Sequence, residues 1–196
     1  IALQGESVSS ASAGQSVEVV LDRTPSYGEA GGQVGDQGVL ISDQVKGVVA
    51  DTVRPTVEMI VHLVRLDEGT LRVGDTILAR VDGERRLDIA RNHTATHLLH
   101  RALRQVLGEH AAQSGSYVSP DHLRFDFTHL AGLSDAELED VERIVNEQIR
   151  ANRPVTTRVM GYEEARKQGA IALFGEKYGD QVRVVSVSGF STELCG

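Results

Sequence analysis

Short runs of alternating apolar and polar residues fill the first 85 positions, and glycine-rich segments separate these runs. Alternation with a period of two is typical of half-buried β-strands, and no helical spacing competes with it here. We therefore predict about six strands in a small β-barrel-like or sandwich-like N-terminal subdomain over residues 1–85. The clearest predicted strands cover 17–21, 38–41, 46–50, 56–66 and 71–81.

From residue 86 onwards the apolar residues follow helical spacing mixed with strands. A long helix is predicted over 86–107 with Gly108 as its cap, and a second helix opens at a capping box that starts at Ser134. The remaining predicted elements are a short helix over 163–168 and strands over 123–127, 155–160 and 181–188. This mixture predicts an α+β fold for residues 86–196, with the long helix packed on an antiparallel sheet.

Two of these elements have distinct faces. In the strand over 123–127 the three apolar side chains share one face, so Arg124 and Asp126 point together to the other. In the second helix an apolar stripe is formed by Leu138, Val141 and Val145.

The long helix also has two faces when its residues are placed 100° apart. One face carries an aliphatic stripe made of Ala95, Leu98, Leu99, Ala102 and Val106. The opposite face carries His93, His97, His100 and Arg104. The pattern therefore disfavours histidines in the core. A solvated face is the common explanation for such a histidine pair, and a set of metal ligands is the alternative.

Cys195 is the only cysteine and follows a predicted strand. Two imidazoles one helical turn apart, together with a thiolate, suit zinc, which takes three or four such ligands. His93, His97 and Cys195 supply three and leave a position for water, substrate or a further ligand. The helical zinc-protease motif keeps Glu beside its first His. Here that residue is Thr94, which argues against a peptidase.

Composition narrows the functional classes. No apolar run is long enough for a membrane span, so we expect no membrane partner. A single cysteine cannot form an internal disulfide and fits a reducing compartment, which predicts a cytoplasmic protein. The net charge of −8 and the aromatic content of 4% argue against binding nucleic acid by bulk charge or by a stacking platform. Because the chain starts at Ile1, we expect it to be part of a longer protein.

Gly31-Gly32-Gln33 is similar to the tripeptide with which translation release factors trigger peptidyl-tRNA hydrolysis. Three residues carry little information, and a glycine-rich hairpin connection is the more common explanation.

Six segments, in this order, resemble the editing domain of alanyl-tRNA synthetase. They are Leu21–Asp36, Asn92–His97, Gln113–Val118, Leu123–Phe127, Leu173–Asp180 and Ser191–Gly196. The free-standing AlaX deacylases and the editing domain of threonyl-tRNA synthetase share the histidine motif and the cysteine. The glycine-rich hairpin belongs to the alanyl group.

The resemblance implies an enzyme that hydrolyses the ester between serine or glycine and the tRNA for alanine. Its expected partners are the 3′ end of that tRNA and the rest of the parent synthetase. The resemblance also implies one zinc ion held by His93, His97 and Cys195. A fourth family ligand, a histidine four positions after the cysteine, is expected beyond Gly196, so the predicted editing core over 86–196 stops within the metal motif.

The resemblance further assigns roles around the pocket. Thr96, Gln113 and Ser116 match positions linked to editing and substrate discrimination. The predicted substrate-binding residues are Arg124, Asp126, Gly31, Gly32 and Gln33.

Several alternatives stay open at this point. Zinc either activates water or positions the substrate. The chain is either a synthetase domain, a separate trans-acting deacylase, or a non-catalytic module whose zinc site stabilises the fold or docks RNA.

Overall fold

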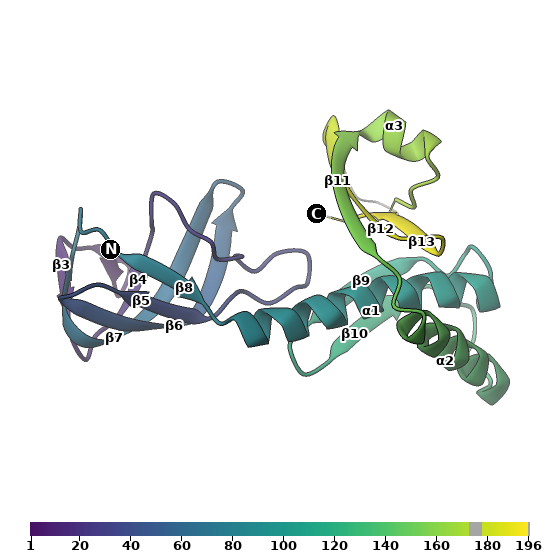
Figure 1. The fold of residues 1–196 in the computed structure, drawn as a ribbon, viewed down its shortest axis with the longest axis horizontal. Helices are drawn as coiled ribbons and strands as arrows, with labels where there is room; N and C mark the ends of the chain where they lie inside the picture. Colours follow the sequence, from purple (N-terminus) through teal and green to yellow (C-terminus); the bar gives the residue numbers. More distant parts are fainter. Residues whose placement is uncertain (173–177, 196) are drawn as a thin grey trace. The chain divides into compact units, whose positions relative to one another are not determined.

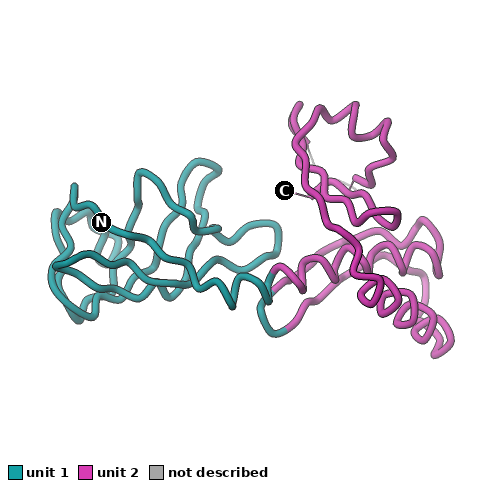
Figure 2. The backbone as a smooth tube through the Cα atoms, viewed as in Figure 1, with its two compact units in different colours: residues 1–89, 119–121 teal, residues 90–118, 122–196 magenta. Residues whose placement is uncertain are grey.

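A computed structural model describes residues 1–172 and 178–195 of the protein. Its described elements are β-strands, paired mostly antiparallel, and a few helices, which confirms the α+β class (Figure 1). Contacts within the chain define two compact units (Figure 2): unit 1 comprises residues 1–89 and 119–121, and unit 2 comprises 90–118 and 122–196. Of the segments that carry the family resemblance, 173–177 and Gly196 lie outside the described residues.

Unit 1 is built on an eight-stranded sheet. Its strands are β1 (Ala2–Leu3), β2 (Glu6–Ser7), β3 (Ser10–Ser12), β4 (Ser16–Val19), β5 (Gly38–Ile41), β6 (Val45–Thr56), β7 (Met59–Arg72) and β8 (Leu78–Val81). They are hydrogen-bonded in the order β2-β1-β4-β7-β6-β5-β8, with β3 also on β7. No pairing among the described strands joins β2 to β8, so the barrel-like expectation is corrected to an open sheet.

The long β6–β7 hairpin explains two differences from the predicted strands. The alternation over 56–66 crosses the hairpin tip, because β6 ends at Thr56 and β7 begins at Met59. Val57 is therefore exposed at the tip, where its carbonyl accepts hydrogen bonds from Arg54. The predicted strand over 71–81 is likewise interrupted by a turn that includes Gly74, which has a φ of 93°. Alternation alone does not reveal a tight turn that preserves the pattern.

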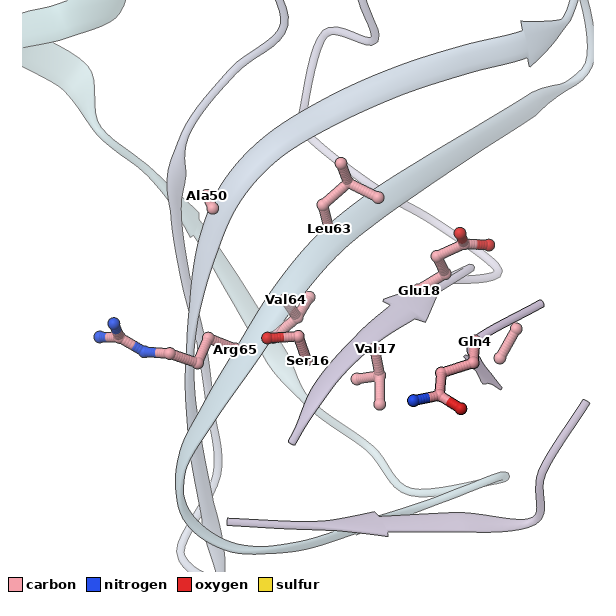
Figure 3. A pocket seen from close by; sticks show the side chains of 9 residues that line it. Gln4, Ser16, Val17, Glu18, Ala50, Leu63, Val64 and Arg65 are labelled. Atoms are coloured by element: carbon pink, nitrogen blue, oxygen red, sulfur yellow. The ribbon is translucent and has the colours of Figure 1, made fainter. Parts of the chain in front are cut away.

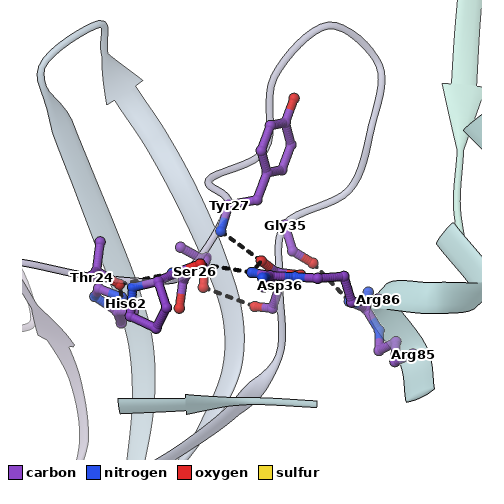
Figure 4. A network of polar contacts seen from close by, with 10 residues as sticks. Thr24, Ser26, Tyr27, Gly35, Asp36, His62, Arg85 and Arg86 are labelled. Atoms are coloured by element: carbon purple, nitrogen blue, oxygen red, sulfur yellow. Dashed lines mark hydrogen bonds and ion pairs between the residues drawn. The ribbon is translucent and has the colours of Figure 1, made fainter. Parts of the chain in front are cut away.

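Polar contacts hold the glycine-rich connection of unit 1 against the sheet, as Figure 4 shows. Asp36 is buried, accepts a 2.6 Å hydrogen bond from the Tyr27 N–H, and pairs with Arg86. The buried His62 bonds Thr24 Oγ1 at 2.8 Å through Nε2. Gly35 is required here, because a Cβ at this position would lie 1.8 Å from the Thr52 carbonyl oxygen.

A pocket of about 310 Å³ also lies in unit 1, beside β4 and β7 (Figure 3). Glu18 and Arg65 line it together with apolar side chains such as Val17 and Leu63. None of the residues predicted to bind metal or substrate lines this pocket.

Unit 2 contains most of α1 (Gly83–Leu107), whose first seven residues belong to unit 1. The other elements are β9 (Gln113–Val118), β10 (Leu123–Phe127), α2 (Asp135–Arg150), β11 (Val155–Gly161), α3 (Tyr162–Lys167), β12 (Gln181–Val187) and β13 (Ser191–Leu194). β9 and β10 form a hairpin, whereas β11, β12 and β13 form a separate three-stranded sheet (Figure 1). β9 and β13 were not predicted.

The core of unit 2 has two parts. In one, Ala102 and Leu103 of α1 pack with Phe125 of β10 and Val141 of α2. In the other, residues of α3, β12 and β13 pack together, and Leu194 is buried there. The capping box at Ser134 is confirmed. The apolar stripe of α2 is shorter than predicted, because Leu138 is half exposed.

The prediction that disfavoured core histidines is wrong for two residues. His97 and His100 are both buried, although they lie opposite the aliphatic stripe. The helical wheel treats the helix alone, whereas in the folded chain a buried carboxylate on β13 contacts this face. In the described part of the chain, α1 and the other helices lack an apolar run of the length that a membrane crossing needs.

Candidate metal centre

Helix α1 places two imidazoles side by side. His93 and His97 are four residues apart, so they lie on the same face one turn apart. Their ring centroids are 5.2 Å apart and the rings are nearly parallel, with an interplanar angle of 17°. The helix itself is confirmed: it ends at Leu107, and the Gly108 N–H bonds the Arg104 carbonyl at 3.1 Å.

The thiol of Cys195 reaches this helix face from the other end of the chain. Its backbone is held on both sides by Arg183 of β12: the Cys195 N–H donates to the Arg183 carbonyl, and the Arg183 guanidinium donates to the Cys195 carbonyl, each at 2.9 Å. The Cys195 Sγ lies 3.1 Å from Nε2 of His93. The ligand atoms of His93, His97 and Cys195 all lie within 4.8 Å of one another.

This donor set fits a tetrahedral zinc ion. Zn–S and Zn–N bonds of about 2.3 and 2.0 Å separate a sulfur from a nitrogen ligand by about 3.5 Å. This value lies between the 3.1 Å that separates His93 Nε2 from Cys195 Sγ and the 4.8 Å within which all three candidate ligand atoms lie. Among the described residues, Nε2 of His97 is buried and has no hydrogen-bond partner. A buried polar atom without a partner costs free energy of folding, and coordination of a metal by this nitrogen would supply the missing partner.

The sequence analysis missed a carboxylate that contacts His97 and His100. Glu193 of β13 is 3% exposed, and its Oε2 accepts from Nδ1 of His97 at 2.7 Å and lies 3.2 Å from Nδ1 of His100. Its Oε1 accepts a 2.7 Å bond from the Ser191 hydroxyl. Glu193 is two residues before Cys195, so strand alternation places both side chains on one face. This spacing is the sequence signal from which a contact between Glu193 and the candidate metal site could have been predicted.

The electrostatics of this cluster favour charged forms. Burial acts to lower the pKa of His97, but its interactions with Cys195 and Glu193 outweigh burial and raise the pKa to about 9. Burial acts to raise the pKa of Cys195, but His93 and His97 lower it to about 6. Burial likewise opposes ionisation of Glu193, but His100 and His97 lower its pKa to about 2. A low thiol pKa suits a metal ligand, because the thiolate is the form that binds.

The residues predicted for editing lie in unit 2 as well. Thr96 is buried, and its hydroxyl donates a 2.9 Å bond to the Asn92 carbonyl one turn earlier. On β9 the Gln113 side-chain amide donates to the Ser116 hydroxyl at 3.1 Å. Ser116 pairs with Phe125, which contacts His100 at a centroid distance of 5.4 Å. The hairpin face that carries Ser116 is therefore the face that contacts α1.

The predicted substrate-binding residues lie elsewhere. Arg124 and Asp126 form a 3.2 Å ion pair on the face of β10 opposite Phe125, as their spacing predicted.

The glycine-rich tripeptide belongs to unit 1, as a tight turn. Gly31 and Gly32 have φ values of 57° and 80°, and Ala30 and Gln33 exchange two backbone hydrogen bonds across them. This geometry is that of a hairpin connection.

Comparisons with known proteins agree with the resemblance in the sequence. The family profile described as tRNA synthetases class II (A) matches residues 1–85. The chain is 54% identical over 198 residues to the alanine–tRNA ligase of Myxococcus xanthus (strain DK1622), a match that covers 100% of this chain and 22% of that protein. The alanine–tRNA ligases of Burkholderia vietnamiensis (strain G4 / LMG 22486) and Burkholderia mallei (strain NCTC 10229) are each 55% identical over 194 residues, which cover 99% of this chain and 22% of each relative.

The chain thus spans about a fifth of the length of the curated relatives it matches, with 22% coverage in each case. All three of these relatives are alanine–tRNA ligases, and each is more than half identical to this chain over 99–100% of its length. The sequence belongs to the alanine–tRNA ligase family, as a segment of its members.

Proposed function

We propose that this chain is the editing part of an alanine–tRNA ligase and hydrolyses the ester that joins serine or glycine to the tRNA for alanine. One observation carries the proposal. In a chain related along its whole length to alanine–tRNA ligases, three soft ligand atoms from positions up to 102 residues apart converge within 4.8 Å. Their arrangement supports a zinc-dependent hydrolase better than a module that binds no metal, because imidazole and thiolate ligands at this separation suit zinc.

The need for a second site follows from binding energies. A synthetase pocket that accepts alanine cannot strongly reject glycine, which is smaller, or serine, which adds one hydroxyl. Such differences amount to about 1–3 kcal/mol, which leaves frequent errors. A separate site that hydrolyses the wrong ester supplies the missing discrimination.

In this proposal His93, His97 and Cys195 hold the metal. When bound, zinc supplies a Lewis acid, which either acidifies a water molecule or holds the amino group of the substrate. Glu193 bonds the Nδ1 side of His97 and leaves Nε2 for the metal.

Thr96 and Gln113 are proposed to recognise the serine hydroxyl. Because the Thr96 proton is donated to the Asn92 carbonyl, its oxygen is left as an acceptor. The Gln113 carbonyl supplies a second acceptor beside Ser116, whose hydroxyl is engaged by the Gln113 amide. Alanine has no hydroxyl and would leave these acceptors unpaired, which costs binding energy, so these two residues account for the choice of serine over alanine and not for glycine.

Contacts to the tRNA end are assigned to local positive charge, since the chain as a whole carries −8. Arg101 and Arg104 lie on α1, and Arg124 lies on the exposed face of β10. The glycine-rich turn at 31–33 is proposed as a further contact for the substrate.

The test is a deacylation assay on Ser-tRNA, Gly-tRNA and Ala-tRNA charged on the tRNA for alanine, with zinc content measured in parallel. The whole protein is compared with Cys195→Ala and His97→Ala, and with Thr192→Val as a matched control. Thr192 lies beside Glu193 and bonds Ser186 on the opposite face of the sheet. We expect the first two variants to lose zinc and serine release together. Undiminished deacylation in either one contradicts the proposal.

A further inference from the structure

We infer that Glu193 is a positioning residue, which fixes the tautomer and orientation of His97 and thereby sets the affinity of the metal centre. This inference rests on the proposed zinc site and goes beyond it, since Glu193 is not one of the three proposed ligands. The observation behind it is the buried network of Ser191, Glu193, His97 and His100.

The first step concerns the tautomer of His97. A neutral imidazole carries one N–H and one lone pair, and the hydrogen bond made by one nitrogen decides the role of the other. Nδ1 of His97 lies 2.7 Å from a carboxylate oxygen, which can only accept while Glu193 is ionised. In the neutral ring that binds a metal, the one proton is therefore on Nδ1 and the lone pair is on Nε2, the buried nitrogen without a hydrogen-bond partner among the described residues.

The second step concerns what holds Glu193. Its two oxygens are occupied by different donors: Ser191 at Oε1, and both histidines at Oε2. The ring of His100 is held in turn by Phe125, with centroids 5.4 Å apart. The carboxylate therefore has a single position, and a ring bonded to it has a single orientation.

The third step is that one strand supplies two parts of the site. Ser191, Glu193 and Cys195 alternate along the end of the chain and share a face, whereas Leu194 points into the opposite core. The opposite residue on β12 is Val185, so an apolar residue at 193 would suit the sheet. Carboxylates that orient a metal-bound histidine typically change metal affinity about 10- to 100-fold when they are removed.

The experiment measures zinc affinity of the whole protein by competition with a chromophoric chelator. Glu193→Gln keeps an acceptor for His97 while its amide donates to Ser191, so we expect about 10-fold weaker binding from the loss of charge alone. Glu193→Leu removes the acceptor as well, and we expect about 100-fold weaker binding. Thr192→Val, on the other face, is the control and should stay within about twofold.

A second readout is the absorption spectrum of the Co²⁺-loaded protein, which reports tetrahedral coordination by thiolate and imidazole. We expect the spectrum to be altered in Glu193→Leu and retained in Thr192→Val. Circular dichroism checks that each variant is folded, and Glu193→Gln decides the question if Glu193→Leu does not fold. A folded Glu193→Gln or Glu193→Leu that binds zinc within twofold of the wild type overturns the inference.

The two proposals fail differently. If Cys195→Ala and His93→Ala bind zinc as tightly as the wild type, the metal centre itself is wrong, and the inference falls with it. If these two variants lose zinc while the folded Glu193 variants keep it, the metal centre stands and only the positioning role is refuted.

Discussion

The buried carboxylate of Asp36 gives the sharpest stability prediction for unit 1. Asp36→Ala removes the acceptor of the Tyr27 N–H, a 2.6 Å bond to a charged group. Such a bond contributes about 1.5–3 kcal/mol. The partner guanidinium of Arg86 is 43% exposed, so its pairing is screened and adds only about 0–1 kcal/mol. We therefore expect Asp36→Ala to lower the free energy of unfolding by about 1.5–4 kcal/mol.

The assay is urea denaturation of the wild type, Asp36→Ala, Arg86→Ala and the double variant. Asp43→Ala is the control, because Asp43 is an exposed turn residue and should change the free energy of unfolding by less than about 0.5 kcal/mol. The double-mutant cycle should give a coupling energy of about 1 kcal/mol or less, since Arg86 keeps its bond to the Pro25 carbonyl. A loss below about 1 kcal/mol in Asp36→Ala would refute this reasoning.

Three further predictions concern unit 1 and the site. Gly35→Ala should destabilise unit 1 by about 1–3 kcal/mol in the same denaturation assay, because its Cβ would meet the Thr52 carbonyl at 1.8 Å, and an unchanged midpoint would contradict this. Removing zinc with a chelator should lower the melting temperature and serine release together, and added zinc should restore both; recovery by a buffer without metal would argue against a metal centre. Gln113→His should reduce the preference for Ser-tRNA over Ala-tRNA with little change in melting temperature, whereas lost stability with unchanged selectivity would assign Gln113 to packing.

Elements with a strong local signal could be predicted from the sequence. The α1 helix, its end before Gly108 and the capping box at Ser134 all depend on neighbouring residues and are confirmed. Strand β10 is confirmed with the Arg124–Asp126 pair on one face. Elements of few residues, such as β13 with its four, carry too little alternation to stand out.

Part of the candidate site could likewise be predicted from the sequence, and the rest depends on tertiary structure. The spacing of His93 and His97 fixes their relation within one helix, so this half of the cluster followed from the sequence. That Cys195 approaches them depends on the β12–β13 pairing, which is a tertiary property. Glu193 was missed because a helical wheel of α1 contains no information about a strand almost a hundred positions away, with a separation of 96 residues from His97.

The separation between helix α1 and Cys195 has a consequence for the unfolded chain. His93 and Cys195 are 102 positions apart, so an ion shared between them, as proposed, would close a loop of that length. A permanent cross-link over about 100 residues removes conformational entropy equivalent to about 4–5 kcal/mol from the unfolded ensemble. The bound ion would then act as a reversible cross-link between α1 and the C-terminal strand. The availability of metal would therefore govern how often this strand detaches and becomes accessible to a protease.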